Sequence, residues 1–114
     1  MTPSDIMSGL ASKNRLLTSK NEEYAGLAEK KAQAERDYKM MVRQEILKHK
    51  SDGHPVTIIL KLVDGQKIVA ELKFKLDVAA AVERACLESI KDIRSQIDTY
   101  RSLLSWLKAE LQSQ

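Results

Sequence analysis

One long apolar seam in the last third of the chain most constrains how this chain can fold. From Asp77 onward the sequence contains neither glycine nor proline, so nothing there breaks a helix. Apolar residues recur in alternating steps of three and four, the spacing with which a helix presents one stripe to a coiled-coil partner. We predict a helix over about residues 77–112, capped by Asp77. Its oligomer seam consists of Ile90, Ile93, Ile97, Tyr100, Leu104, Leu107 and Leu111.

A second long helix is predicted over about residues 4–50. Thr2 can cap its beginning, and Pro3 suits the first helical position. At the other end Gly53 can adopt a left-handed cap, and Pro55 prevents continuation. Charged residues interrupt the heptad positions of this helix, so it offers the weaker seam. The apolar heptad positions are Leu10, Leu17, Tyr24, Leu27, Ala34, Tyr38 and Met41.

Between the helices the apolar period changes to two, which predicts a β-hairpin over about residues 56–75. A three-residue loop of Val63, Asp64 and Gly65 would pair even with even positions and place Gly65 in a left-handed bulge. An isolated hairpin is marginal in water, so it must lean on helices or on hairpins of other chains. Its apolar face would contain Ile58, Leu60, Leu62, Ile68, Leu72 and Phe74. Lys61, Lys67, Lys73 and Lys75 would lie on the wet face.

These elements predict a mainly α fold, with two long antiparallel helices of a coiled coil joined by the hairpin in a single domain over residues 1–114. Burying an exposed Leu or Ile gains ~1.5–3 kcal/mol. The seam therefore looks too extensive for one chain to cover, and we expect a homo-oligomer. Its number of chains, and whether the helices pair within or between chains, stay open. Pairing by length leaves Ile6, Met7 and Leu10 beyond the second long helix.

Cysteine content and hydropathy bear on the compartment. A single cysteine, Cys86, excludes an internal disulfide and fits a reducing environment. No apolar run approaches the ~18 residues of a membrane span, and the start lacks the features of a signal peptide. We therefore expect a cytoplasmic protein without membrane contact.

Few residues suggest metal binding or catalysis. His49, Asp52 and His54 could join in a metal site, but a metal site needs three or four converging ligands; we predict a capping cluster and no metal. Cys86 could be a nucleophile, but its place on the apolar stripe predicts a buried side chain. We find no phosphate-binding glycine loop. The sequence thus predicts no cofactor, no catalytic residue and no enzyme.

The hairpin lysines permit nucleic-acid contact. Lys61, Lys67, Lys73 and Lys75 are candidate phosphate contacts. Lysines on a short exposed hairpin also prevent edge-to-edge aggregation, and no aromatic platform accompanies these four. We favour the second interpretation.

Two resemblances follow from these features. The order helix, hairpin, helix resembles the β-type subunit of prefoldin, a holdase whose hairpins assemble while its coiled coils extend as tentacles. The stretch from Glu71 through Ala79 to Leu103–Lys108 is similar to small uncharacterised coiled-coil proteins of bacteriophages and prophages of Gram-positive bacteria. That similarity implies a phage accessory protein, expressed with replication or recombination genes.

The predicted function is a non-enzymatic, oligomeric coiled-coil protein with a structural or interaction role and an unknown protein partner. One alternative is a prefoldin-like holdase, favoured by the apolar Leu103 and Trp106 outside the strict seam. The other is a nucleic-acid-binding accessory protein of phage replication or recombination, favoured by the hairpin lysines and a pI near 9.0.

Overall fold

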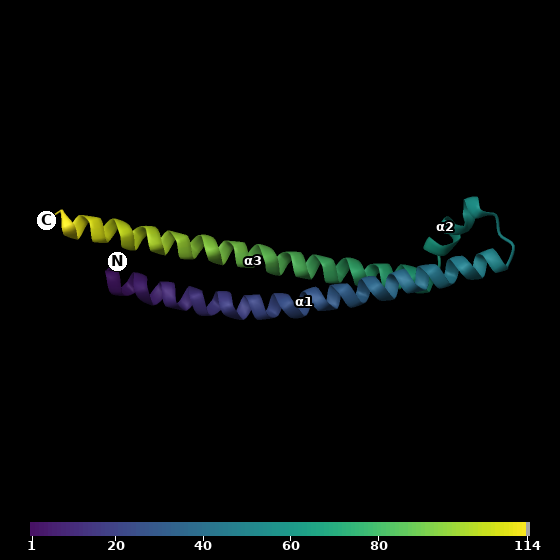
Figure 1. The fold of residues 1–114 in the computed structure, drawn as a ribbon, viewed down its shortest axis with the longest axis horizontal. Coiled ribbons are helices and arrows are strands. Elements are labelled where there is room, and N and C mark those ends of the chain that lie inside the picture. Colours follow the sequence, from purple (N-terminus) through teal and green to yellow (C-terminus); the bar gives the residue numbers. More distant parts are fainter. Residues whose placement is uncertain (114) are drawn as a thin grey trace. The chain divides into compact units, whose positions relative to one another are not determined.

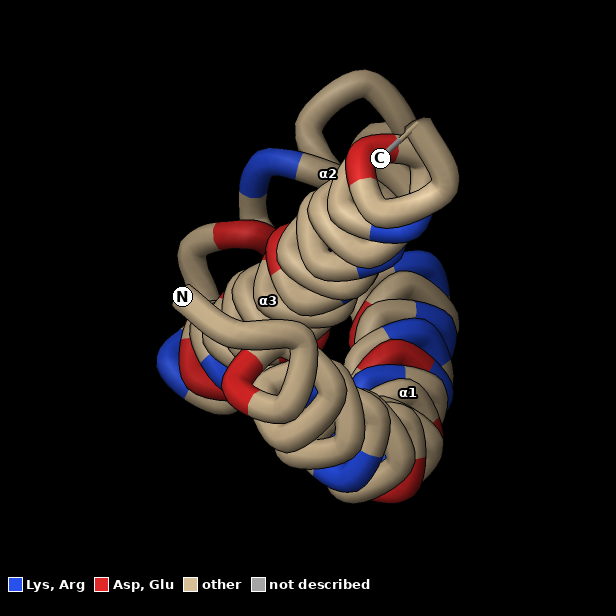
Figure 2. Tube along the Cα trace, turned by 90° about the vertical axis from the view of Figure 1, so that its left-hand side faces the viewer, with Lys and Arg blue, Asp and Glu red and all other residues tan. Residues whose placement is uncertain are grey.

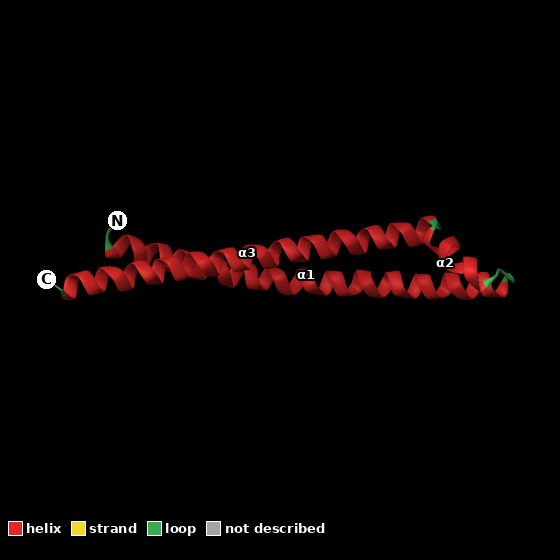
Figure 3. Ribbon diagram, turned by 90° about the horizontal axis from the view of Figure 1, so that it is seen from above, coloured by secondary structure: helices red, strands yellow, loops and turns green. Residues whose placement is uncertain are grey.

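The structure, a computed structural model, describes residues 1–113 and is built from helices (Figure 1). Helix α1 spans Pro3–Ser51, the short helix α2 spans Val56–Asp64, and α3 spans Lys67–Gln112. No strand occurs among these 113 residues (Figure 3). The two long helices are compatible with a coiled coil. The β-hairpin predicted between them, and with it the fold predicted for the chain, is wrong.

The hairpin prediction fails because the alternating pattern was incomplete. Ile59, Val63 and Val69 occupy odd positions, which the hairpin would have exposed to solvent. They are nevertheless the buried residues of this region. Ile59 and Val63 lie four residues apart, so they share one face of a helix. A helix can bury both residues on one side. The predicted hairpin, which buries only its even positions, would expose them.

The beginning of α1 has the predicted cap. The Asp5 backbone N–H donates to Thr2 Oγ1 at 3.2 Å, and the Thr2 backbone N–H donates to Asp5 Oδ2 at 3.0 Å. This reciprocal pair is a capping box. The hydrogen bond from the Thr2 backbone lowers the pKa of the Asp5 carboxyl below its ordinary value.

The end of α1 is also as predicted. Gly53 has a left-handed φ of 82°. The Gly53 N–H donates to the Lys50 carbonyl and the His54 N–H donates to the His49 carbonyl, each at 3.1 Å. Together these bonds form a Schellman motif. Pro55, in an extended conformation, is the N-cap residue of α2.

The connection between α2 and α3 is a short helical turn. The Gly65 N–H donates to the Lys61 carbonyl at 3.2 Å, and Gly65 has φ −80°. The predicted left-handed bulge at Gly65 is therefore wrong. Because α3 begins at Lys67, Asp77 lies inside the helix and does not cap it. Its carboxylate instead pairs with Lys73 at 3.3 Å, one turn earlier.

The chain divides into two compact units. The terminal unit consists of Met1–Ala25 and the part of α3 from Arg84 onward. Its two segments are antiparallel, because Cys86 lies at Lys20 and Tyr100 lies at Gly9. Its buried side chains are Ile6, Cys86, Ile90, Ile93 and Ile97.

The central unit is Gly26–Glu83, which includes α2. Its core is formed by Ile59 and Val63 of α2 and Val69 of α3. An ion pair of 3.2 Å between Lys31 Nζ and Glu83 Oε2 links α1 to α3. The α1 residues packed against the core are Tyr38, Met41, Val42 and Ile46.

Helix α1 carries charges of both signs. Both blue Lys and Arg and red Asp and Glu segments are visible on it (Figure 2). Among the described residues, no helix combines the length and the apolar character that crossing a membrane requires.

Candidate functional site

The predicted oligomer seam belongs to the terminal unit, and its three isoleucines are buried there. Ile90, Ile93 and Ile97 are only 2–4% exposed, and within this unit only the α1 segment can cover them. Tyr100, Leu104 and Leu107 are half-buried, and Leu111 is 65% exposed. The expectation that the chain cannot cover this seam is therefore wrong for its isoleucines.

The beginning of α1 contributes to this cover. Ile6 is 1% exposed and Leu10 is half-buried, while Met7 is 62% exposed. The expectation that these three residues extend beyond the partner helix is therefore wrong. The cause is the register, since Gly9 lies at Tyr100 and α3 continues for twelve residues after it.

Cys86 is buried at 6% exposure, as predicted. Its Sγ lies 3.7 Å from the Lys20 carbonyl oxygen, to which the thiol donates. This places the thiol inside the helix pair of the terminal unit.

The residues assigned to the apolar face of the hairpin are mostly exposed. Leu72 is half-buried. The others have exposures from 37% to 68%: Ile58, Leu60, Leu62, Ile68 and Phe74. The prediction identified an apolar set, but in the helices these residues flank the core or lie outside it.

Helix α2 has a broader apolar side than the central unit covers. Six of its nine residues are apolar, and only Ile59 and Val63 are buried. At 100° per residue, the other four flank this pair on both sides. Thr57, Lys61 and Asp64 form the polar side. The exposed flanks are Val56 (74%), Leu60 (61%), Ile58 (40%) and Leu62 (37%); we call them the α2 flanks.

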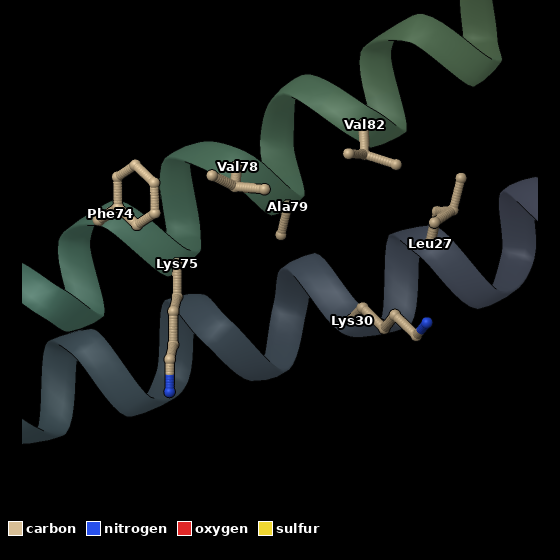
Figure 4. Close-up of a pocket in the computed structure, with 7 residues that line it drawn as sticks. All are labelled: Leu27, Lys30, Phe74, Lys75, Val78, Ala79 and Val82. Carbon is tan, nitrogen blue, oxygen red and sulfur yellow. The ribbon is translucent and has the colours of Figure 1, made fainter.

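A second apolar feature of the central unit is a groove of about 350 Å³ between α1 and α3 (Figure 4). Phe74, Val78 and Val82 line it at four-residue spacing along α3, and Leu27 extends toward them from α1. Phe74 is 68% exposed, and the two valines are each 45% exposed. Ala79 completes the lining, together with Lys30 and Lys75. We call this the Phe74 groove.

The four lysines assigned to possible phosphate contact do not form one stripe. On a helix Lys73 and Lys75 project about 160° apart. Lys73 pairs with Asp77 and lies 5.5 Å from the centre of the Tyr38 ring, whereas Lys75 lines the Phe74 groove. Lys61 is on α2 and Lys67 is the first residue of α3. The single wet face predicted for them is absent from the described residues.

The structure brings together the three residues for which the sequence predicts a capping cluster and no metal. One candidate ligand atom from each of His49, Asp52 and His54 lies within 4.8 Å of the other two. The rings of His49 and His54 are 5.2 Å apart between centroids. The Gln66 amide nitrogen lies 2.9 Å from His49 Nε2. His49 Nδ1 is buried without a hydrogen-bond partner.

Comparisons with known proteins add no function. A scan of protein-family models and searches of curated proteins and of solved structures found no match to this chain. The resemblance to phage coiled-coil proteins therefore stays a prediction. The resemblance to prefoldin depended on the hairpin, so it loses its basis.

Proposed function

We propose that this chain is a non-enzymatic helical interaction protein that associates with a second copy of itself through α2. One observation carries the proposal: four of the six apolar residues of α2 are exposed at its flanks. Helices with so broad an apolar side are normally buried on that whole side. The protein would occupy a reducing compartment such as the cytoplasm, which the buried free thiol of Cys86 supports.

The energetics favour a weak, reversible association. Full burial of a Leu, Ile or Val gains ~1.5–3 kcal/mol, and the α2 flanks begin from partial exposure. One flank contributes two residues from each copy, and these four side chains give several kcal/mol, of which association entropy consumes a large part. We expect a dissociation constant of roughly 10–100 µM, typical of a small interface.

A second copy fits the α2 flanks because they contain no charge. In a two-fold symmetric contact the same patch meets itself, so a charged patch would place like charges together. The more exposed flank, Val56 and Leu60, avoids this, and Lys61 and Asp64 lie beyond it on the polar side. The Phe74 groove is a poorer self-contact because two lysines line it.

The test is the mass of the protein in solution as a function of concentration. Sedimentation velocity from about 1 µM to about 1 mM should show a monomer–dimer equilibrium. Val56→Asp or Leu60→Asp should raise the dissociation constant at least ~10-fold, which corresponds to ~1.4 kcal/mol.

Thr57→Asp is the matched control. It adds the same charge next to Val56, in the same first turn, but on the polar side of α2. Circular dichroism should show that all three variants keep their helix content. A monomer at every concentration, or an equal effect of the Val56 and Thr57 variants, would contradict the proposal.

The Phe74 groove supports a second candidate function, the holding of apolar segments of unfolded proteins. Its floor is apolar and its lysines favour segments flanked by Asp or Glu. The wild-type chain would then slow aggregation of a chemically denatured client, and Phe74→Asp would abolish this effect. Gln33→Asp, on the exposed side of α1 outside the groove, is the control. Equal protection by both variants would exclude the groove as the client site.

A further inference from the structure

The connection from α1 to α2 holds its backbone in one conformation. Gly53 supplies the left-handed turn of the Schellman motif. Pro55 restricts the residue before it, His54, to extended conformations. The His54 N–H donates to the His49 carbonyl, and the Asp52 N–H donates to the Lys48 carbonyl at 2.9 Å. The closeness of the two histidines therefore follows from the backbone.

His49 is held on its far side as well. Its Nε2 is within hydrogen-bond distance of the Gln66 side-chain amide, which comes from the α2–α3 connection. The Gln66 amide nitrogen faces Nε2; when a metal binds, a rotation of this amide by about 180° would turn its oxygen toward the ring. Nε2–H would then donate to that oxygen, and Nδ1 would carry the free lone pair. A histidine metal ligand typically donates its other ring N–H to an outer partner in this way. Nδ1 is buried without a hydrogen-bond partner, and a bound cation would satisfy it.

From this geometry we infer that His49, Asp52 and His54 form a binding site for a divalent transition-metal cation such as Zn²⁺. Two imidazoles and one carboxylate are a ligand set that Zn²⁺ and its neighbours in the first transition row accept. His49 binds through Nδ1, Gln66 orients its ring, and water fills the remaining positions because Asp52 and His54 are exposed.

The candidate ligand atoms of His49, Asp52 and His54 are close enough together to coordinate one cation after small side-chain rotations. Metal–ligand bonds of ~2.0–2.1 Å place tetrahedral ligand atoms about 3.4 Å apart. Here the ligand atoms lie within 4.8 Å of one another, and side-chain rotation of the exposed Asp52 and His54 can bring them to coordination distance without a change in the backbone.

The charges around the site have opposite effects on the binding of a cation. The C-terminal end of a helix favours a cation, and the Asp52 carboxylate adds to this attraction. Lys48 and Lys50, in the same last turn, repel it. We therefore expect a dissociation constant of about 1–10 µM, weaker than that of structural zinc sites.

The experiment is calorimetric titration of the full chain with ZnCl₂, in a Cys86→Ala background that removes the single thiol. One ion per chain should bind, and an absorption spectrum with Co²⁺ should show nitrogen and oxygen ligands. His54→Gln and Asp52→Asn should each weaken Zn²⁺ binding at least ~10-fold, and Gln66→Ala about 10-fold through the outer partner.

Asp64→Asn is the matched control, because Asp64 is an exposed aspartate in the same unit outside the cluster. It should bind Zn²⁺ like the wild type. Absence of binding at about 100 µM Zn²⁺ would overturn the inference. So would undiminished binding by His54→Gln, or one ion per two chains, which would mean a site between copies. The Val56→Asp variant should bind Zn²⁺ normally, so this inference and the proposed self-association fail or succeed separately.

Discussion

The Tyr100 ring lies so close to the Gly9 backbone that a Cβ atom at Gly9 would come within 2.7 Å of Tyr100 Cζ. Both residues belong to the terminal unit, where glycine lets α1 and α3 approach. Gly26, in the same helix α1 but in the central unit, has no atom within 4 Å of such a Cβ. An alanine methyl group therefore fits at Gly26 but collides with the Tyr100 ring at Gly9.

Gly9→Ala and Gly26→Ala should have opposite effects on stability. Alanine is the better helix former, so Gly26→Ala should raise the free energy of unfolding by about 0.5–1 kcal/mol. Gly9→Ala should lower it by about 1 kcal/mol, since the overpacking outweighs that gain. Urea denaturation measures both. In a Tyr100→Ala background Gly9→Ala should become stabilising, and equal gains at both positions would contradict the contact.

Ile93→Ala should destabilise the terminal unit by ~2–5 kcal/mol, the usual cost of truncating a buried Ile. Leu111→Ala, at an exposed position of the same seam, should change stability by less than about 0.5 kcal/mol. Thermal and urea unfolding provide the measurement. The mass in solution should not change with Ile93→Ala, because this residue is covered within the chain. A lower mass with unaltered stability would show that the seam joins different chains.

Gly53→Ala should cost about 1 kcal/mol, because an L side chain at φ 82° is strained. Gly65→Ala is the control: its φ is −80°, and the nearest atom to a new Cβ is 3.5 Å away. It should be neutral or slightly stabilising in the same urea titration. Equal losses from both substitutions would argue against the left-handed end of α1.

The first turn of α1 should loosen in acid. The folded pKa of Asp5 is lowered, so its contribution to stability is present above the unfolded pKa and is lost as the pH falls through the folded value. Hydrogen exchange of the first-turn amides, compared between about pH 5 and pH 2, should show this loss in the wild type. Asp5→Asn should lack it, while Asp98→Asn, on α3, should behave like the wild type.

Helix α1, and α3 from Asp77 onward, were predictable because their composition and their lack of internal proline both favour helix. Helix α1 was expected over residues 4–50 and spans Pro3–Ser51, since its caps and its composition point the same way. The segment from Val56 to Phe74 was not predictable from alternation. Its β-branched residues favour strands, and Asp64-Gly65 resembles a hairpin turn. Packing against Tyr38 and Ile46 decided for helix. The apolar odd positions Ile59 and Val63 were the signal that could have revealed it.

The candidate sites show the same limit. The seam of Ile90, Ile93 and Ile97 was correctly recognised as a packing surface, but a pattern does not identify its partner. The gathering of His49 and His54 was predictable, because a Schellman motif with Gly53 at its left-handed position brings the flanking residues together. The sequence predicted both this cap and a capping cluster of His49, Asp52 and His54, but it assigned the cluster no metal.

Ile6 belongs to the second turn of α1 and is 1% exposed. Helix termini ordinarily fray and tolerate trimming, but this one carries a core side chain close to its start. Trimming or bulky fusion should therefore harm the terminal unit at the amino end far more than near Leu111, which is largely exposed. Affinity tags and truncation boundaries for this protein belong at the carboxyl end.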